Sequence, residues 1–356
     1  MQPPSLAMAE GIRRRVRVNK LSDMPTDSLP HIVVVAMGGT IAGSSASSTD
    51  STGYKAGTTG VDDLLAAIPE LGALARITGQ QFAQIDSSDL TDEILLGLAR
   101  HIETLASAPD VDGIVITHGT DTLEETAYFL HLVLSTEIPV ILVGSMRPAT
   151  ALSADGPMNM FGAVAVASSP LAAGQGVLVV MSDTIHSARD VTKSSSLSVD
   201  AFESLHGPLG TVFDGTVVFY RNVSRPHTYA TEFSLDAITA LPSAAIIYAH
   251  SGLTASFVDR IVDDGYDVIV HAGFGNGMVA QRTVQSLERA RTAGTMIVRA
   301  SRSQSAQVTT IGASDPIANN WIAALDQNPQ RSRILACLAL TVTTGPAEIQ
   351  RIFHRY

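Results

Sequence analysis

Short apolar runs rich in β-branched residues alternate along the chain with stretches of helical periodicity. One such stretch places Ile94, Leu95, Leu98, Ala99, Ile102 and Leu105 on a single helix face. The short runs are typical of strands buried on both faces of a sheet. They are Ile32–Val35, Gly113–Thr117, Val140–Gly144, Gly176–Met181, Ala244–Tyr248, Val268–Ala272 and Thr295–Ala300. Alternating strands and helices predict an α/β fold with mostly parallel sheets flanked by helices.

The pattern weakens between Arg221 and Pro242, where neither a strand nor a helix period is evident. A chain of 356 residues also exceeds the usual size of a single core, which favours two domains. The larger domain holds about four of the strands and the smaller one about three. We therefore predict a disordered N-terminal extension over residues 1–30, a larger N-terminal α/β domain over 31–221, a linker over 222–242 and a smaller C-terminal α/β domain over 243–356.

Composition and charge narrow the classes of function. The formal net charge of −11 argues against a general nucleic-acid binder, because phosphate neutralisation needs clustered Lys and Arg. The single cysteine, Cys337, excludes an intrachain disulfide. No apolar run reaches the roughly 18 residues of a membrane span. The basic residues Arg13–Arg15 precede no apolar stretch of the kind found in signal peptides, so the chain as written is predicted to be cytoplasmic, or periplasmic or secreted if a signal was removed.

A glycine-rich turn follows the first predicted strand, in the stretch Met37-Gly38-Gly39-Thr40-Ile41-Ala42-Gly43. Its glycines fit neither a dinucleotide fingerprint nor a P-loop. They allow a close turn that exposes the Thr40 hydroxyl at the sheet edge, although Thr40 as a simple helix cap fits equally well. Downstream, Tyr54 lies in a Ser-, Thr- and Gly-rich stretch that fits a lid, where it either packs at the surface or assists a nucleophile.

A second polar cluster, His118-Gly119-Thr120-Asp121, joins a predicted strand to a predicted helix. Asp121 with Glu124 three residues later reads as a capping box. The same helix N-terminus would also stabilise negative charge on the oxygen of an attacked carbonyl. His118 invites comparison with a catalytic triad, but no G-x-S-x-G elbow accompanies it, and a structural role is favoured.

Lys193 ends a third segment, Asp190-Val191-Thr192-Lys193. One interpretation is an ordinary salt bridge. The other is a base that activates a threonine, for which the lysine must be neutral and its pKa must lie well below the usual value of about 10.4.

Together these segments resemble the bacterial L-asparaginase family, most closely its type II members. The resemblance covers residues 31–356 and rests on the order of several motifs. They are Gly38-Gly39-Thr40-Ile41-Ala42-Gly43, Tyr54 with Ala56-Gly57, Ile116-Thr117-His118-Gly119-Thr120-Asp121-Thr122, Glu124–Leu130, Gly144–Asn159, Asp190-Val191-Thr192-Lys193 and Asn328-Pro329-Gln330.

The resemblance implies an amidohydrolase that converts L-asparagine into L-aspartate and ammonia. Thr40 would attack the side-chain amide and form an acyl-enzyme, with Tyr54 assisting it. Thr120, Asp121 and Lys193 would form the family's second catalytic cluster, in which Lys193 relays a proton through Thr120.

Substrate recognition is also implied by matched positions. Ser87, with Ser88 beside it, would hold the α-carboxylate, and Asp121 would accept the α-ammonium. The chain departs from the family pattern at Met37, where threonine is common, and at Ser88, where glutamine or glutamate is usual. The acidic residue that a neighbouring subunit donates aligns loosely with Asp315. Asparagine is predicted to be preferred over glutamine.

The family assembles as homotetramers whose sites are completed across subunits, which predicts the same assembly here. No cofactor and no metal is expected, because the ten histidines show no ligand spacing and threonine chemistry needs no metal. Two alternatives stay open. One is a glutaminase-asparaginase of broader specificity, and the other is a sensor that binds an amino acid without hydrolysing it.

Overall fold

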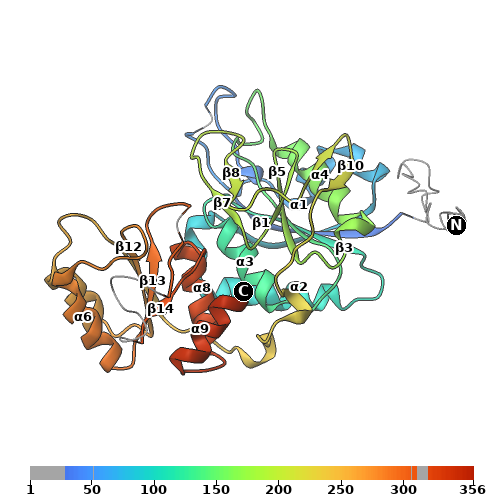
Figure 1. Cartoon of the computed structure of the whole chain (residues 1–356). Coiled ribbons are helices and arrows are strands. Elements are labelled where there is room, and N and C mark those ends of the chain that lie inside the picture. The colour runs from blue at the N-terminus through green and yellow to red at the C-terminus, as the bar shows by residue number, and fades with distance from the viewer. Residues whose placement is uncertain (1–28, 51, 306, 311–319) are drawn as a thin grey trace, which may run out of the picture.

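The computed structural model describes residues 29–50, 52–305, 307–310 and 320–356 of the chain. The predicted extension lies outside the described residues up to position 28, and so does Asp315. Figure 1 shows a larger unit built from the N-terminal two thirds of the chain and a smaller C-terminal unit beside it. The prediction of two α/β units is confirmed.

The larger unit contains an eight-stranded mixed sheet in the order β10-β9-β6-β5-β4-β3-β1-β2. Its parallel part consists of β2 (Arg76–Ile85), β1 (His31–Gly38), β3 (Gly113–Thr117), β4 (Val140–Val143) and β5 (Val177–Met181). Antiparallel strands extend it, namely β6 (Thr184–Ser187), β9 (Gly210–Phe213) and β10 (Thr216–Phe219). The sheet is therefore less parallel, and has more strands, than the sequence pattern predicts.

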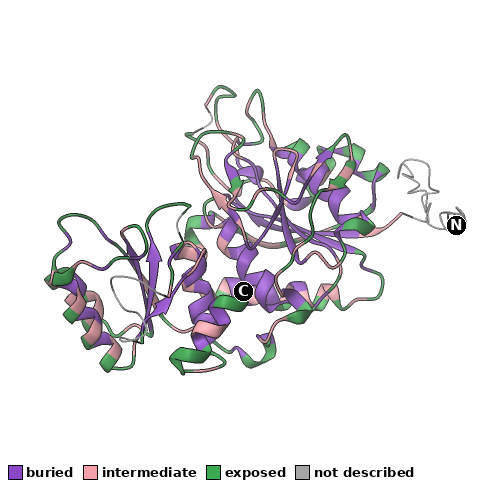
Figure 2. Cartoon of the chain, viewed as in Figure 1, coloured by how far each residue is buried: buried purple, intermediate pink, exposed green. Residues whose placement is uncertain are grey.

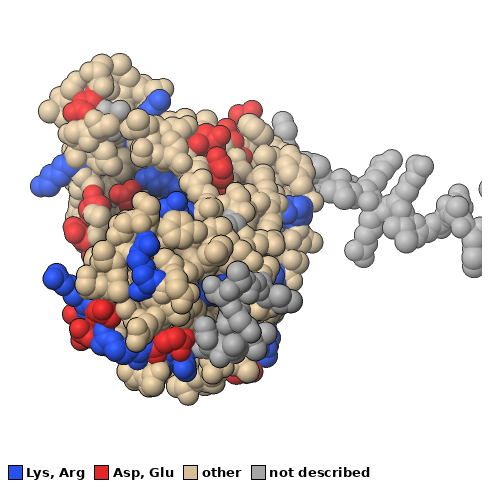
Figure 3. Space-filling view, turned by 60° about the vertical axis from the view of Figure 1, so that its left-hand side comes forward, with Lys and Arg blue, Asp and Glu red and all other residues tan. Residues whose placement is uncertain are grey.

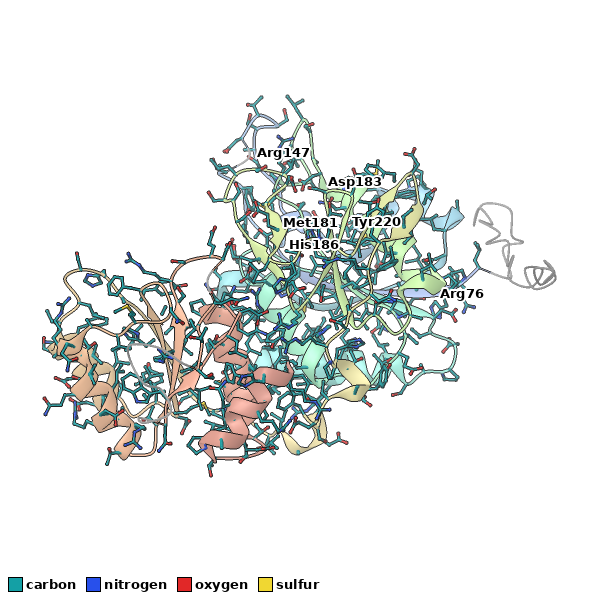
Figure 4. The ribbon with its side chains drawn as sticks, viewed as in Figure 1. Arg76, Arg147, Met181, Asp183, His186 and Tyr220 are labelled. Carbon is teal, nitrogen blue, oxygen red and sulfur yellow. The ribbon has the colours of Figure 1, made fainter. Side chains whose placement is uncertain are left out.

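A tight hairpin reverses the direction of the sheet after β5. Ser182 and Asp183 join β5 to β6 with φ angles of 47° and 60°, and two consecutive positive φ values characterise the turn whose twist suits a hairpin. Figure 4 labels Met181 at the end of β5, Asp183 in the turn and His186 on β6. The chain then forms a separate ribbon of β7 (Val191–Lys193) and β8 (Phe202–Ser204), which carries Lys193.

Helices cover both faces of the large sheet. On one face lie α1 (Val61–Ala66) and α4 (Gly156–Ala167), and on the other α2 (Asp92–Ala106) and α3 (Leu123–Val133). The 3-10 turns of this unit are η3 (Thr40–Ala42), η4 (Pro69–Ala73), η5 (Ser87–Asp89) and η6 (Pro170–Ala172). The predicted helix stripe is part of α2, whose Leu95, Leu98, Ala99 and Ile102 are buried.

The smaller unit contains a parallel sheet of β11 (Ala244–Tyr248), β12 (Val268–Gly273), β13 (Met296–Ser301) and β14 (Ile322–Ala323). Its outer face packs against α5 (Ala255–Asp263) and α6 (Gln281–Thr292). Its inner face packs against α8 (Pro329–Leu340), which is followed by α9 (Pro346–Arg355). The segment predicted as a linker, 222–242, contains the short turns η7 (Thr228–Ala230) and η8 (Leu235–Ala237).

One hydrophobic core joins the two units. It contains buried residues from β1, α2 and α3 of the larger unit together with residues from α8, β12 and β13 of the smaller one. Figure 1 places α8 and α9 between the two sheets, and Figure 2 shows α8 as mostly buried. Helix α9 buries Ile349, Ile352 and Phe353 and leaves its other side more exposed. Helix α8 is thus in contact with both α3 and the small sheet. Among the described residues, no helix combines the length and the apolar character needed to cross a membrane.

Candidate active site

The candidate site lies where three neighbouring parallel strands of the large sheet end. Thr40 follows β1, Ser87 follows β2 and Thr120 follows β3, and β1 lies between the other two strands. The carboxyl ends of parallel strands meet at the same edge of a sheet, so the turns after them are brought together. All three hydroxyl residues are buried.

Two glycines allow the Thr40 and Thr120 turns to touch. Gly39 has a φ of 77°, and a Cβ atom built on it would lie 2.4 Å from both the Cα and the N of Gly119. A Cβ on Gly119 would lie 2.5 Å from the Oγ of Ser87. Only residues without side chains fit at these two positions, and their absence of side chains packs the three turns into one site.

Thr40 contacts Tyr54, as the sequence suggested for a lid tyrosine. The Thr40 Oγ1 and the Tyr54 hydroxyl lie 2.6 Å apart. The segment that carries Tyr54 folds back onto the Thr40 turn, where the N–H of Gly57 donates to the Gly39 carbonyl and those of Thr58 and Thr59 donate to the Ala42 carbonyl. These bonds hold the tyrosine over the threonine.

Lys193 reaches the second threonine from the β7–β8 ribbon. Its Nζ lies 2.8 Å from the Oγ1 of Thr120 and 2.6 Å from Oδ1 of Asp121. The Lys193 side chain is 18% exposed, whereas that of Asp121 is 63% exposed. The lysine is therefore mostly enclosed beside Thr120, while Asp121 keeps free surface for a ligand. The salt bridge predicted as one interpretation is present, and Lys193 also contacts Thr120, while the role of the lysine as a base stays a prediction.

The capping box predicted for Asp121 and Glu124 is wrong. Helix α3 begins at Leu123, its N-cap residue is Thr122, and no side chain caps it. The side chain of Glu124 turns inward instead, where Oε2 accepts the backbone N–H of Lys193 at 2.7 Å and Oε1 accepts from the Asn328 amide at 3.0 Å. A buried carboxylate with two donors at hand gains more from them than from the exposed end of the helix.

His118 has a structural place behind the site. It is buried, its Nδ1 donates to the Gly119 carbonyl at 2.7 Å, and its Nε2 accepts from the Thr126 hydroxyl at 2.9 Å. Burial lowers the pKa of His118 and so keeps the imidazole neutral. The ring fixes the backbone of the turn that carries Thr120.

The predicted carboxylate pocket is only partly assembled around Ser87. The Ser87 Oγ accepts the backbone N–H of Asp121 at 3.3 Å, which ties it to the second threonine turn. Ser88 is exposed, and its hydroxyl donates to Asp86 at 2.8 Å rather than pointing at the threonines. The pairing with Asp315 falls outside the described residues.

A cavity of about 350 Å³ opens beside Lys193 and Asp121. Its far wall comes from the smaller unit and includes Tyr248, Arg302 and Gln330. Figure 3 shows a hollowed face on which basic and acidic side chains lie side by side. Such mixed charge suits a zwitterionic ligand. Among the described residues, no group of three or more His, Cys, Asp or Glu side chains is arranged to hold a metal ion.

Three residues around Lys193 were not predicted as part of the site. They are Glu124, Asn328 and Arg331, which bind the β7 strand from α3 and α8. The sequence does indicate a helix start at Asn328, because Asn followed by Pro329 is typical of one. What the helix start would touch could not be read from the sequence.

Comparisons with known proteins agree along nearly the whole described chain. A family model described as "Asparaginase, N-terminal" matches residues 31–225, and one described as "Glutaminase/Asparaginase C-terminal domain" matches residues 244–353. A glutaminase-asparaginase of Pseudomonas fluorescens biotype A is 45% identical over 329 residues, which cover 92% of this chain and 91% of the relative. L-asparaginase 2 of Escherichia coli K12 is 42% identical over 330 residues, with coverage of 92% and 94%.

A solved structure is similar as well. The crystal structure of a probable cytoplasmic L-asparaginase from Campylobacter jejuni superposes with a TM-score of 0.89 at 43% sequence identity. The match covers 92% of this chain and 100% of that one.

Proposed function

Because this chain belongs to the bacterial L-asparaginase family and hydrolyses L-asparagine to L-aspartate and ammonia, we propose that Thr40 is its nucleophile. The observation that carries the proposal is the pair of buried threonines on touching turns, each with its own proton partner. Tyr54 is the partner of Thr40 and Lys193 that of Thr120. A site that only binds an amino acid would need neither hydroxyl activated in this way.

In the first step Thr40 Oγ1 bonds to the carbon of the side-chain amide as its proton passes to the Tyr54 oxygen, and Tyr54 gives its own hydroxyl proton to the amide nitrogen. The C–N bond then breaks, ammonia leaves, and an ester links aspartate to Thr40. The 2.6 Å contact between the two hydroxyls supports direct proton transfer.

In the second step water attacks the ester and releases aspartate and the free Thr40 hydroxyl. Lys193 Nζ bonds to Thr120. With the lysine neutral, a proton passes from the water through Thr120 to Nζ and is then returned to the leaving oxygen of Thr40. Asp121 holds the lysine in place from its other side. The N-terminus of α3 adds positive potential where oxygen becomes negative.

For recognition, we assign Asp121 to the α-ammonium group and Ser87 to the α-carboxylate of the substrate, with Ser88 at the rim. The exposed carboxylate of Asp121 supports this role, because a charged acceptor must be reachable by the ligand. Asp315 of a neighbouring subunit remains our proposal for the further acidic group. We propose that asparagine is preferred over glutamine, as the additional methylene of glutamine must be accommodated in the same site.

Ammonia release from L-asparagine tests this assignment. The unchanged chain and Thr104→Ala, whose hydroxyl bonds only to its own helix carbonyl, should release ammonia at equal rates. Thr40→Ala and Lys193→Met should lose activity by about a thousandfold or more. Full activity of Thr40→Ala would overturn the choice of nucleophile. Equal kcat/KM values for L-glutamine and L-asparagine would favour the broader glutaminase-asparaginase instead.

We also propose a homotetramer with sites completed across subunits, and a cytoplasmic location like that named for the Campylobacter relative, with a periplasmic or secreted form as the alternative. Light scattering coupled to size-exclusion chromatography measures the mass of the assembly. A mass of four chains is expected, and a stable, active monomer would contradict it. Fractionation of the native host followed by immunoblotting identifies the compartment that holds the protein.

A further inference from the structure

The main chain of Lys193 is held as firmly as its Nζ atom, and by residues the reaction does not use. The side chain of Lys193 reaches Thr120 and Asp121, on the turn that leads into α3. Its backbone N–H donates to Glu124, two residues into the same helix. One continuous segment therefore binds both ends of the lysine, and it fixes where Nζ can lie.

The carboxylate of Glu124 is itself held by helix α8 of the smaller unit. Asn328 is the N-cap of α8, and its Oδ1 accepts the N–H of Arg331 at 2.8 Å. This cap fixes the orientation of the Asn328 amide. Its Nδ2 consequently points away from the helix and donates to Glu124 at 3.0 Å and to Thr192 at 3.2 Å.

Arg331 completes the contact between α8 and the β7 strand. Its guanidinium is buried and donates to the Val191 carbonyl at 2.7 Å and to the Thr192 hydroxyl at 2.9 Å. Residues 191, 192 and 193 are thus each bound by a side chain from α3 or α8. Strand β7 has three residues, and within the described part of the chain its only partner strand is β8. The contacts with α3 and α8 therefore supply order that a large sheet would otherwise give.

The charge on Glu124 is balanced within this cluster. Burial raises the pKa of Glu124, whereas Arg331, the Lys193 N–H and the Asn328 amide all favour its charged form. The residue is 6% exposed and forms part of the wall of the cavity beside Lys193, but its two carboxylate oxygens are taken by the Lys193 N–H and the Asn328 amide. We therefore expect Glu124 to affect the reaction through Lys193.

We propose that Glu124 is a positioning residue for Lys193 and that Asn328 and Arg331 lock it in place, so that helix α8 of the smaller unit sets the position of the catalytic lysine. The inference rests on the role of Lys193 given above. It assigns a function in catalysis to the contact between the two units, beyond holding the chain together.

The donor and acceptor pattern gives a specific test. In Glu124→Gln, the new amide oxygen can accept the Lys193 N–H only if the new amide NH2 faces the NH2 of Asn328. The Asn328 amide cannot turn to relieve this clash, because its oxygen is held by the capping bond to Arg331. Lys193 should shift, and kcat for asparagine should fall on the order of tenfold to a hundredfold. KM should change by less than about threefold, because the carboxylate oxygens of Glu124 are bound to Lys193 and Asn328 and are not free to bind the substrate.

Asn328→Asp, the reciprocal change, creates a mismatch of its own, and the two mismatches should cancel when both substitutions are combined. Asn328→Asp keeps the helix cap but sets two carboxylates against each other, and kcat should again fall on the order of tenfold or more. In the double variant, the amide introduced in place of Glu124 donates to the carboxylate introduced in place of Asn328. It still accepts the Lys193 N–H, and Arg331 remains beside the moved charge. The kcat of the double variant should return to within about threefold of the unchanged enzyme.

Arg333→Gln is the matched control. Arg333 joins the same two helices through Glu125, at 3.1 Å, without touching β7. It should lower the melting temperature but leave kcat per folded enzyme within about twofold. The proposal fails if Glu124→Gln behaves like this control, or if the double variant is no faster than either single variant. Activity retained by Lys193→Met would instead overturn the assigned role of the lysine.

Discussion

At the scale of single residues, Gly39 decides whether the two threonine turns can meet. In Gly39→Ala the new Cβ would overlap backbone atoms of Gly119, which cannot rotate away as a side chain can. The φ of 77° adds a cost of about 1 kcal/mol or more for a residue with a side chain. We expect kcat for asparagine to fall on the order of a hundredfold and the melting temperature to fall as well.

Gly72→Ala is the control for that change. A Cβ on Gly72 would meet nothing within 4 Å, and its φ is not in the left-handed region. Activity and melting temperature should stay as they are in the unchanged chain. If Gly39→Ala were as active as Gly72→Ala, the close approach of the two turns would not matter for the reaction.

Tyr54 is the second residue whose role can be isolated. Tyr54→Phe removes only the hydroxyl that lies 2.6 Å from Thr40. We expect kcat to fall about a hundredfold with little change in KM, since the hydroxyl acts on the nucleophile and not on substrate binding. Steady-state ammonia release measures both constants.

A second tyrosine–threonine pair in the chain provides the comparison. The Tyr220 hydroxyl lies 3.1 Å from the Thr211 Oγ1 at the exposed edge of the large sheet, and Figure 4 labels its position. Tyr220→Phe should leave kcat unchanged. Equal losses in the two variants would point to a general effect of removing a tyrosine hydroxyl.

Residue types and order in the sequence were enough to nominate both threonines, Tyr54, Asp121 and Lys193. The direction in which Glu124 points was not readable, because a carboxylate three residues after an aspartate at a helix start fits a capping box. Its true donors lie at positions 193 and 328, far along the chain. Local patterns cannot choose between a local and a distant partner.

At the scale of elements, the two units are joined by a buried ion pair as well as by packing. Arg189, just before β7, forms a two-point contact with Asp326, just before α8, at 2.7 and 3.0 Å. Both side chains are largely buried. The pair lowers the pKa of Asp326 despite its burial, which is the mark of a carboxylate that depends on its partner.

Asp326→Asn should therefore destabilise the fold. It leaves the Arg189 guanidinium buried with part of its charge uncompensated, and such a change costs about 3 kcal/mol. Urea unfolding followed by circular dichroism measures the loss. Asp263→Asn, which breaks an exposed contact to the half-exposed Arg289, should have little or no effect. Equal losses of unfolding free energy in Asp326→Asn and Asp263→Asn would show that burial of the Arg189–Asp326 pair adds nothing to stability.

The elements themselves were predicted unevenly. Strands buried on both faces, such as β3 and β5, have continuous apolar runs and were found. Strand β2 lies at the edge of the sheet with its residues partly exposed, so its sequence carries polar residues and no run. The short strands β6, β9 and β10 gain their order from hairpin pairing, which apolar periodicity does not report.

At the scale of the whole molecule, five buried histidines make stability depend on pH. Burial lowers the pKa of His118, His131, His186, His227 and His271, to about 3 for His131 and about 4 for His186 and His271. An unfolded histidine titrates near pH 6.5. Between that value and about pH 4 the unfolded chain binds more protons than the folded one, so stability falls as the pH falls through this window.

His271 is the clearest member of this group to test. It is fully buried on β12, and neither ring nitrogen has a hydrogen-bond partner among the described residues. At pH 5 its depressed pKa should account for about 2 kcal/mol of lost stability. His271→Leu removes the titrating ring at similar volume, so the drop in unfolding free energy from pH 7 to pH 5 should shrink by that amount.

Between pH 7 and pH 8, where a histidine with a lowered pKa does not titrate, the variant and the unchanged chain should respond alike. A drop of the same size in both between pH 7 and pH 5 would mean that other groups, and not this buried imidazole, control the acid sensitivity of the fold.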